Sequence, residues 1–121
     1  MLLDTCVVID HLRGRSEASE FIGRLQARPA VSTVTIAEVF AGLRSQGAEQ
    51  IARSFFVSCE VLPVDPFVAE AGGNFMRHYQ PSHSMDLGDA LIAATAEHHG
   101  LELATLNVKH FPMFKGLKAA Y

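Results

Sequence analysis

The chain has 121 residues, 49% of them hydrophobic and 19% charged, which suits one hydrophobic core and excludes disordered and fibrous classes of protein. Ten Lys and Arg residues against thirteen Asp and Glu residues give a formal net charge of −3, so the general basic field that holds nucleic acid by counterion release is absent. We therefore expect a single domain over residues 1–121, in which any contact with nucleic acid is local or uses a metal ion.

Three features of the sequence indicate the compartment. The opening MLLDT has no basic leader and no long apolar run, so we expect no signal peptide. The apolar stretch at residues 90–96 is far shorter than the ~20 residues of a membrane span. Cys6 and Cys59 lie in apolar segments without CxxC spacing, which indicates two buried thiols. Together these features predict a cytoplasmic protein without a membrane partner.

Short apolar runs alternate with helical segments along the chain. The expected strands are the apolar runs at residues 1–3, 30–32, 61–64 and 101–105. The expected helices cover residues 6–12, 16–28, 35–43, 48–56, 66–79 and 86–99, with a short helical end from residue 108. Strands that alternate with helices favour a parallel sheet covered on both faces. The expected fold is an α/β three-layer sandwich with a short central parallel β-sheet.

Local signals predict where these helices begin and end. Ser16 and the Asp65–Pro66 pair are expected N-caps, with the proline at the first helical position. Gly47 is expected to break the chain between two helices, and the pair at residues 72–73 weakens the helix that contains it. Residues 80–84 are expected to form a polar loop.

Acidic and amide residues stand where the carboxyl ends of the expected strands meet. Asp4 ends the first strand, Glu38 lies in the first turn after the second, and Asn107 follows the fourth. Asp89 lies in the first turn of the most apolar helix, with Asp86 three residues earlier on the same face. Because ligands of open parallel sheets bind at this edge, we expect these residues to form a site.

Clustered carboxylates repel one another, so such a site must hold protons or bind a cation. Oxygen ligands without a Cys/His cluster favour Mg²⁺ or Mn²⁺ over zinc. An ion of this kind suits the hydrolysis of a phosphodiester, because it neutralises the phosphate and activates a water.

Each of these acids also fits a purely structural role. Asp86 is a good N-cap, and the helix dipole alone favours Asp89. Thr35 and Glu38 fit a capping box, and Asp4 could cap the first helix. Against this, Glu38 lies about 160–200° from the apolar stripe of its helix, so it faces either water or a cleft.

Three segments of the chain, with the spacing between them, form a recognisable pattern: MLLDTCVVIDHLRG, VSTVTIAEVFAGL and DALIAATAEHHGLELATLNVKHF. This pattern resembles that of PIN-domain ribonucleases, specifically the VapC-like toxins of type II toxin–antitoxin pairs. The resemblance implies Mg²⁺-dependent endonuclease cleavage of RNA, often in a tRNA or rRNA loop, with Mn²⁺ as a possible substitute. It also implies a VapB-like antitoxin partner that places a basic side chain in the acidic cleft.

By this resemblance, Asp4, Glu38 and Asp89 match the acidic metal-site positions of the family. Asp4 and Asp89 would be Mg²⁺ ligands, while Glu38 would bind the ion through water or orient the nucleophile. The family's fourth acidic position falls on Asn107, an amide, which leaves one or two metal ions open. The residues expected to support these acids are Thr5, Thr105, Asn107 and Asp86.

Basic residues near these motifs are candidates for contacts with phosphates. They are Arg13, Arg15, Arg44 and Lys109. The six histidines show no metal-ligand spacing, so none is expected to have a catalytic role.

The segments that carry Phe40, Leu43, Ile51, Phe55 and Phe56 supply more apolar surface than one thin α/β layer needs. We expect a homodimer that buries this surplus, and VapC-like proteins are similar in forming dimers. The alternative is that these residues complete the core of the monomer.

Two other classes of function stay open. A phosphoacceptor receiver domain is also an α/β sandwich with a Mg²⁺-binding acid cluster, and it would use Asp65 as acceptor and Lys109 as charge partner. Such a domain needs an acidic pair after the first strand, where this chain has Asp4 followed by Thr5. A binding module that has lost catalysis is the second alternative, favoured by the amide at Asn107.

Overall fold

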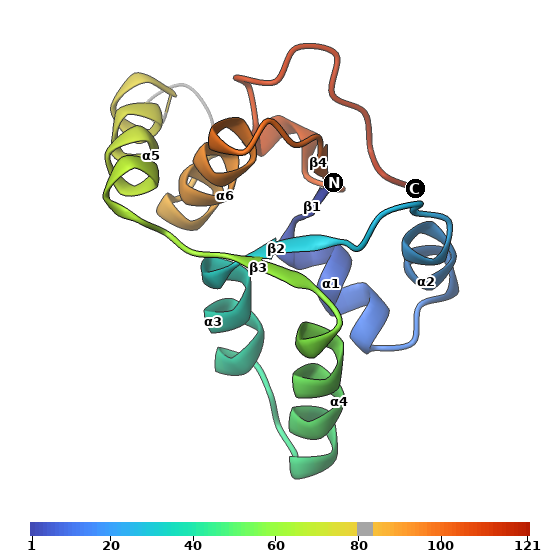
Figure 1. Cartoon of the computed structure of the whole chain (residues 1–121). Helices are drawn as coiled ribbons and strands as arrows, with labels where there is room; N and C mark the ends of the chain where they lie inside the picture. Colours follow the sequence, from blue (N-terminus) through green and yellow to red (C-terminus); the bar gives the residue numbers. More distant parts are fainter. Residues whose placement is uncertain (80–83) are drawn as a thin grey trace.

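The sheet has four parallel strands in the order β3-β2-β1-β4. This computed structural model describes residues 1–79 and 84–121, so most of the polar loop expected at 80–84 lies outside the described residues. The strands are β1 (Leu2–Leu3), β2 (Ala30–Ser32), β3 (Glu60–Leu62) and β4 (Leu103–Ala104). Because Leu2 pairs with both Ala30 and Leu103, β1 lies between β2 and β4 (Figure 1).

Helices cover both faces of this sheet, which confirms the expected α/β sandwich (Figure 1). They are α1 (Thr5–Leu12), α2 (Ser16–Gly23), α3 (Thr33–Ala41), α4 (Gln46–Val57), α5 (Pro66–Tyr79) and α6 (Leu87–His98), followed by a 3₁₀ turn, η1 (Val108–His110). One face is covered by α1 to α4, and the other by α6, on which α5 packs. Within the described ranges, no helix is both long and apolar enough to cross a membrane.

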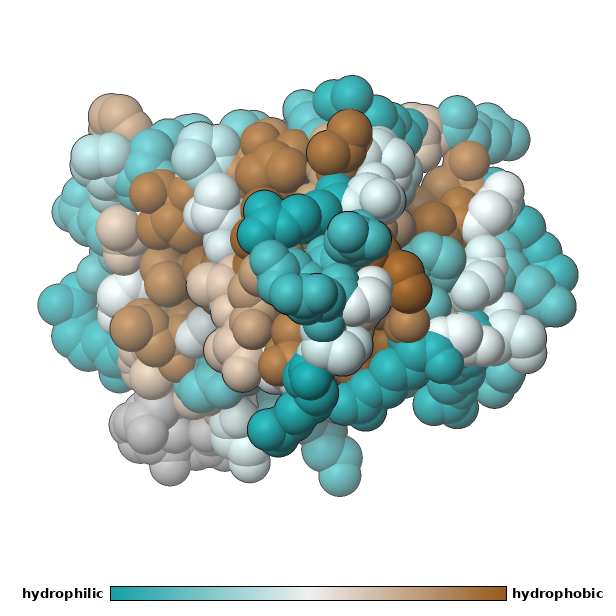
Figure 2. All heavy atoms as spheres, turned by 90° about the horizontal axis from the view of Figure 1, so that it is seen from below, coloured by the Kyte–Doolittle hydropathy of each residue, from teal (hydrophilic) through white to brown (hydrophobic). Residues whose placement is uncertain are grey.

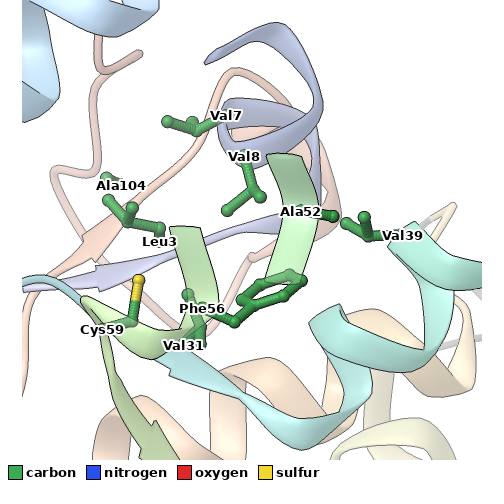
Figure 3. Packing of buried hydrophobic residues seen from close by; sticks show 9 residues of the cluster. All are labelled: Leu3, Val7, Val8, Val31, Val39, Ala52, Phe56, Cys59 and Ala104. Carbon is green, nitrogen blue, oxygen red and sulfur yellow. The ribbon is translucent and has the colours of Figure 1, made fainter. Parts of the chain in front are cut away.

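Two clusters of buried side chains hold the layers together, because neighbouring residues of a strand point to opposite faces. The first cluster joins β1, β2 and β4 to α1, α3 and α4 (Figure 3), and it consists of Leu3, Val7, Val8, Val31, Val39, Ala52, Phe56, Cys59 and Ala104. The second joins all four strands to α6 and to the residue that follows η1, and it consists of Leu2, Ala30, Leu62, Ile92, Ala93, Ala96, Leu103 and Phe111. β1, β2 and β4 are therefore buried on both sides, whereas β3, at an edge of the sheet, exposes Glu60 and Val61.

Several expected helix ends are wrong, and in α4 the reason is a polar residue that caps the helix earlier. Ser16 is the first residue of α2, and its hydroxyl donates to Glu17 rather than capping the helix. That helix also ends at Gly23, well before Pro29. Gly47 lies inside α4, because the Ser45 hydroxyl accepts from the backbone N–H of Ala48 and starts the helix earlier.

The capping box expected of Thr35 and Glu38 is also wrong. Ser32 caps α3 by accepting from the backbone N–H of Val34, so Thr35 lies inside the helix and is fully buried. Asp65 does cap α5, as expected, by accepting from the backbone N–H of Val68 at 2.9 Å.

The apolar residues expected at a dimer interface mostly complete the monomer. Phe56 is only 7% exposed, and Phe40 and Phe55 pack against the first cluster. Ile51 and Val57, by contrast, are 57% and 83% exposed. The homodimer therefore stays a prediction, with Ile51 and Val57 as the exposed part of this segment.

The contact between α5 and α6 depends on one glycine. A Cβ added at Gly72 would lie 2.7 Å from Leu91 Cδ2 and 3.4 Å from Leu91 Cα, whereas a Cβ at Gly73 would meet nothing within 4 Å. The pair that weakens the helix by its propensity therefore contains one residue required for packing and one that is not.

We expect Gly73→Ala to raise the free energy of unfolding by up to about 1 kcal/mol, because alanine favours a helix over glycine. Gly72→Ala gains the same propensity but overpacks the contact with Leu91, at a cost of about 1–3 kcal/mol, so it should be neutral or destabilising. Urea unfolding of the two variants measures both effects. Equal stabilisation by both would contradict the close approach of α5 and α6.

Candidate active site

Asp4 lies at the junction between β1 and α1, and its carboxylate is 3% exposed. Its backbone N–H donates to Ala104 at 2.9 Å, which continues the pairing of β1 with β4. The Oδ1 atom accepts from the Thr5 backbone N–H at 2.8 Å, and Oδ2 accepts from the Thr105 hydroxyl at 2.7 Å. Asp4 thus caps α1, as the structural interpretation predicts. It also places a buried carboxylate at the edge of the sheet where the strands end.

Glu38 is joined to this region through Thr5. The Thr5 hydroxyl donates to Glu38 Oε1 at 2.6 Å and lies 3.1 Å from the buried Thr35 hydroxyl. The other oxygen, Oε2, lies 3.1 Å from the position that a Cβ would take at Gly88, in the first turn of α6. Glu38 therefore faces the start of α6, and the absence of a side chain at Gly88 makes room for its carboxylate.

Asp86 and Asp89 form a reciprocal capping box at the start of α6. Asp86 Oδ1 accepts from the Asp89 backbone N–H at 2.8 Å, and Asp89 Oδ2 accepts from the Asp86 backbone N–H at 3.1 Å. The same Asp89 oxygen lies 3.2 Å from His110 Nδ1, and the Asp89 side chain is only 13% exposed. The structural interpretation of this pair is correct, but among the described residues no hydrogen bond occupies Asp89 Oδ1.

The electrostatics of Asp89 connect it to Asp4. Burial is the largest cause that raises the pKa of Asp89, to about 6, and the negative charges of Asp86 and Asp4 add to it. The Asp86 backbone N–H and the charge of His110 oppose this rise. Asp89 is thus a carboxyl that binds a proton more tightly than usual, as expected where acids converge.

Cys6 contributes a thiol to the same cluster. Its Sγ lies 3.4 Å from Asp4 Oδ2 and 3.7 Å from the Thr105 hydroxyl, and it accepts from the Leu106 backbone N–H at 3.5 Å. Burial and the charge of Asp4 raise the pKa of Cys6, which keeps the thiol protonated and makes it a poor metal ligand. The donors available to a cation are therefore carboxylate oxygens.

The structure brings most of the expected site residues together, from four separate segments of the chain. They are Asp4, Thr5, Glu38, Asp86, Asp89 and Thr105. Asn107 lies beside them, since its backbone N–H donates to the Thr105 hydroxyl at 2.9 Å and its side chain is exposed. Across the described residues, no three His, Cys, Asp or Glu side chains are already close enough to share a metal ion.

Two residues at the site were not expected from the sequence, Cys6 and His110. The sequence predicts no catalytic role for the histidines, yet His110 contacts Asp89 because η1 turns the chain back after Asn107. The spacing of three residues between Asn107 and His110 is the only local signal for that turn. Nothing local to Cys6 predicts its contact with Thr105.

The four basic candidates lie in different places. Arg15 pairs with Asp10 at 3.3 Å and Glu17 at 3.2 Å, so its charge is already compensated. Lys109 is exposed on η1, beside the site. Arg13 and Arg44 instead line a separate groove.

This groove, which we call the α1/α3/α4 groove, is apolar and has a volume of about 330 Å³. It is lined by Ile9, Leu12, Arg13, Val39, Gly42, Leu43, Arg44, Ala48 and Ile51. Figure 2 shows the molecule from below, where apolar surface borders the projecting α3–α4 pair on both sides. The groove lies toward the C-terminal ends of α1 and α3, whereas Asp4 caps the opposite end of α1.

Comparison with known proteins agrees with this geometry. The PIN domain matches residues 1–112. Ribonuclease VapC10 of Mycobacterium tuberculosis is 41% identical over 124 aligned positions, which cover 100% of this chain and 92% of that protein. Ribonuclease VapC19 of the same organism is 36% identical, with 99% of this chain and 98% of that protein covered. A chain in a toxin–antitoxin complex from Klebsiella pneumoniae superimposes with a TM-score of 0.86 at 32% identity, covering 99% and 97% of the two chains.

The raised pKa of Asp89 predicts how the stability of the metal-free protein depends on pH. The folded state binds this proton more tightly than the unfolded state, in which the pKa is about 3.9, so the contribution is full below pH 4 and is lost as pH rises through 6. With EDTA present, Asp89→Asn should therefore unfold at higher urea than the wild type at pH 7 to 8. Between pH 4 and 7 its stability should decline less.

The matched control is Asp65→Asn, which exchanges the cap of α5 and leaves the acid cluster unchanged. Equal pH profiles for the wild type and Asp89→Asn would contradict a proton held at Asp89.

Proposed function

The chain belongs to the PIN-domain family, and we propose that it is a Mg²⁺-dependent endoribonuclease that acts as the toxin of a toxin–antitoxin pair. The observation that carries this proposal is the convergence of Asp4, Glu38 and Asp89 at one edge of the sheet. The names of the relatives, ribonucleases VapC10 and VapC19, support cleavage of RNA.

The donor set fits a hard divalent cation. The charge of Asp4 adds to the raised pKa of Asp89, and a cation between the two carboxylates would offset their repulsion. Their ligand atoms are oxygens, and the nearby Cys6 thiol stays protonated, so Mg²⁺ or Mn²⁺ suits the site better than zinc. We assign Asp4 and Asp89 as the residues that hold the ion, with Glu38 binding through water. When bound, the ion supplies neutralisation of the phosphate and a more acidic water.

The protein's own residues position these groups. Thr105 and the Thr5 backbone hold both oxygens of Asp4, so the carboxylate cannot rotate away from the edge of the sheet. The Thr5 hydroxyl holds Glu38 Oε1 and leaves Oε2 free to take a proton from an attacking water. These bonds keep the acids in place before substrate arrives, which is the condition for electrostatic catalysis.

RNA approaches this acidic edge without a general basic field. The exposed amide of Asn107 and the exposed Lys109 lie at the mouth of the site, and we assign them to phosphate contacts. His110 is a third donor there once Asp89 engages the cation. Loops of tRNA or rRNA suit such a site because their backbone is accessible and has a distinct shape that a protein can recognise.

The alternatives are weaker. Asp65 caps α5 and the chain has the PIN fold, so the receiver interpretation is wrong. The binding module differs from the nuclease only in lacking cleavage, and the variants below decide between them.

The α1/α3/α4 groove is our candidate site for a VapB-like antitoxin, and the toxin–antitoxin complex from Klebsiella pneumoniae supports such a partner. Its apolar walls and its rim of Arg13 and Arg44 suit an apolar segment that carries acidic side chains. From this groove the antitoxin would extend a basic side chain to the acid cluster, where guanidinium matches paired carboxylates.

We expect Asp4→Asn and Asp89→Asn each to lower the rate of RNA cleavage in Mg²⁺ by about a hundredfold or more, because each removes charge needed in the transition state. Thermal melting should also lose its increase with Mg²⁺, since binding to the folded state raises the melting point by mass action. Asp65→Asn is the control and should behave as the wild type in both measurements. Sequencing of RNA 5′ ends after induced expression, with Asp4→Ala as the inactive comparison, identifies the substrate. Full cleavage by either variant would remove that residue from the site.

Ile51→Glu tests the groove. Ile51 is 57% exposed and lines the groove, so the substitution should leave the fold and RNA cleavage intact but weaken antitoxin binding by about tenfold or more. Val57→Glu is the control, because Val57 is 83% exposed on the same helix and does not line this groove. Titration of each variant with the purified antitoxin, read as inhibition of cleavage, measures the effect. Equal inhibition of both variants would place the antitoxin elsewhere.

A further inference from the structure

We propose that Tyr121 is a positioning residue for the acid cluster, because its hydroxyl fastens the last segment of the chain against β4 and so holds Thr105 against Asp4. The effect on catalysis rests on the proposed nuclease function, whereas the effect on the structure does not.

Tyr121 is held by several contacts at once. Its hydroxyl donates to Asp10 Oδ2 at 2.6 Å, and the Arg15 guanidinium contacts the same oxygen at 3.3 Å. That guanidinium also lies over the Tyr121 ring, 5.8 Å from its centre, and the Phe21 ring packs at 6.1 Å. Burial and the hydrogen bond to Asp10 raise the pKa of Tyr121, so the phenol stays a donor at physiological pH. Two helices, α1 and α2, therefore fix the position of this one side chain.

The residue before Tyr121, Ala120, connects the anchored side chain to the site. The Ala120 backbone N–H donates to the Thr105 carbonyl at 2.9 Å, directly after the end of β4. Thr105 is fully buried, and its hydroxyl donates to Asp4 while it accepts from the Asn107 backbone N–H. One backbone hydrogen bond thus separates the anchored segment from the residue that orients the Asp4 carboxylate.

Together these contacts form a closed series of interactions through α1, which we call the circuit. Asp4 caps the start of α1, and Asp10 lies six residues later, about 9 Å along the helix axis. From Asp10 the circuit runs through Tyr121 and Ala120 to Thr105, and back to Asp4. β4 itself has only two paired residues, Leu103 and Ala104, so the chain after it needs a further contact to fix its position. The hydrogen bond of Tyr121 to Asp10 supplies that contact.

Tyr121→Phe keeps the ring and removes only the hydroxyl, so it tests the circuit without unfolding the chain. We expect amide hydrogen exchange at Ala120 and Asn107 to be about tenfold faster, since each reports the position of Thr105. In single-turnover cleavage of a labelled tRNA and rRNA pool in Mg²⁺, the rate at saturating protein should fall by about tenfold. The protein concentration that gives half of that rate should not change, because phosphate contacts are untouched.

Four further variants extend the test. Asp10→Ala should reproduce the loss, and adding Tyr121→Phe to it should cause little further change, because both remove the same bond. Asp10→Asn keeps an oxygen acceptor and should restore most of the rate. Ser16→Ala is the matched control, since it removes an exposed hydroxyl that donates to Glu17 at 2.9 Å on α2.

Each outcome decides the proposal. Unchanged exchange and cleavage in Tyr121→Phe would overturn it, and faster exchange with an unchanged rate would reduce Tyr121 to a structural anchor. If the wild type does not cleave RNA at all, the proposed function fails. In that case exchange at Asn107 still tests whether Tyr121 positions Thr105.

Discussion

The buried carboxylate of Asp4 is the constraint on which the rest of the structure depends. A charge that is 3% exposed is costly unless hydrogen bonds satisfy it, and here the donors are the first turn of α1 and the Thr105 hydroxyl. Both donors can reach Asp4 only if β1 is flanked by β4 and followed at once by a helix. The central place of β1 in the sheet and the burial of its two leucines are thus tied to the chemistry at its end.

The acid cluster is arranged at some cost to stability. Asp89 is buried near other carboxylates, and its pKa of about 6 reflects first its burial and then the negative charges of Asp86 and Asp4. Hydrogen bonds from backbone N–H groups and hydroxyls reduce this cost but leave the negative charges of the carboxylates in place. A divalent cation, or the basic side chain of a partner, would offset the repulsion between them.

The distribution of cations explains how an acidic protein can act on RNA. Arg15, Arg24 and Arg53 pair with nearby acids on α1, α2 and α4, so their charges add little to an external field. What is left at the site is a neutral amide, Asn107, with Lys109 next to it. Under the proposed function, a bound cation would supply most of the attraction to phosphate.

The sequence by itself determined the fold class and the three acids. Apolar runs of two or three residues between helical segments predict a parallel sheet, and the resemblance to the family predicts Asp4, Glu38 and Asp89 as its acidic positions. In the structure Glu38 lies in the second turn of α3 rather than in its first. Only the tertiary structure decided which side chains meet: Thr105 lies 101 residues from Asp4, and Tyr121 lies 111 residues from Asp10. The tertiary structure also pairs Arg15 with Asp10 of the same chain and places His110 beside Asp89. Periodicity and caps are local properties of the chain, whereas these contacts depend on the strand order and on the path of the chain after β4, which no local pattern encodes.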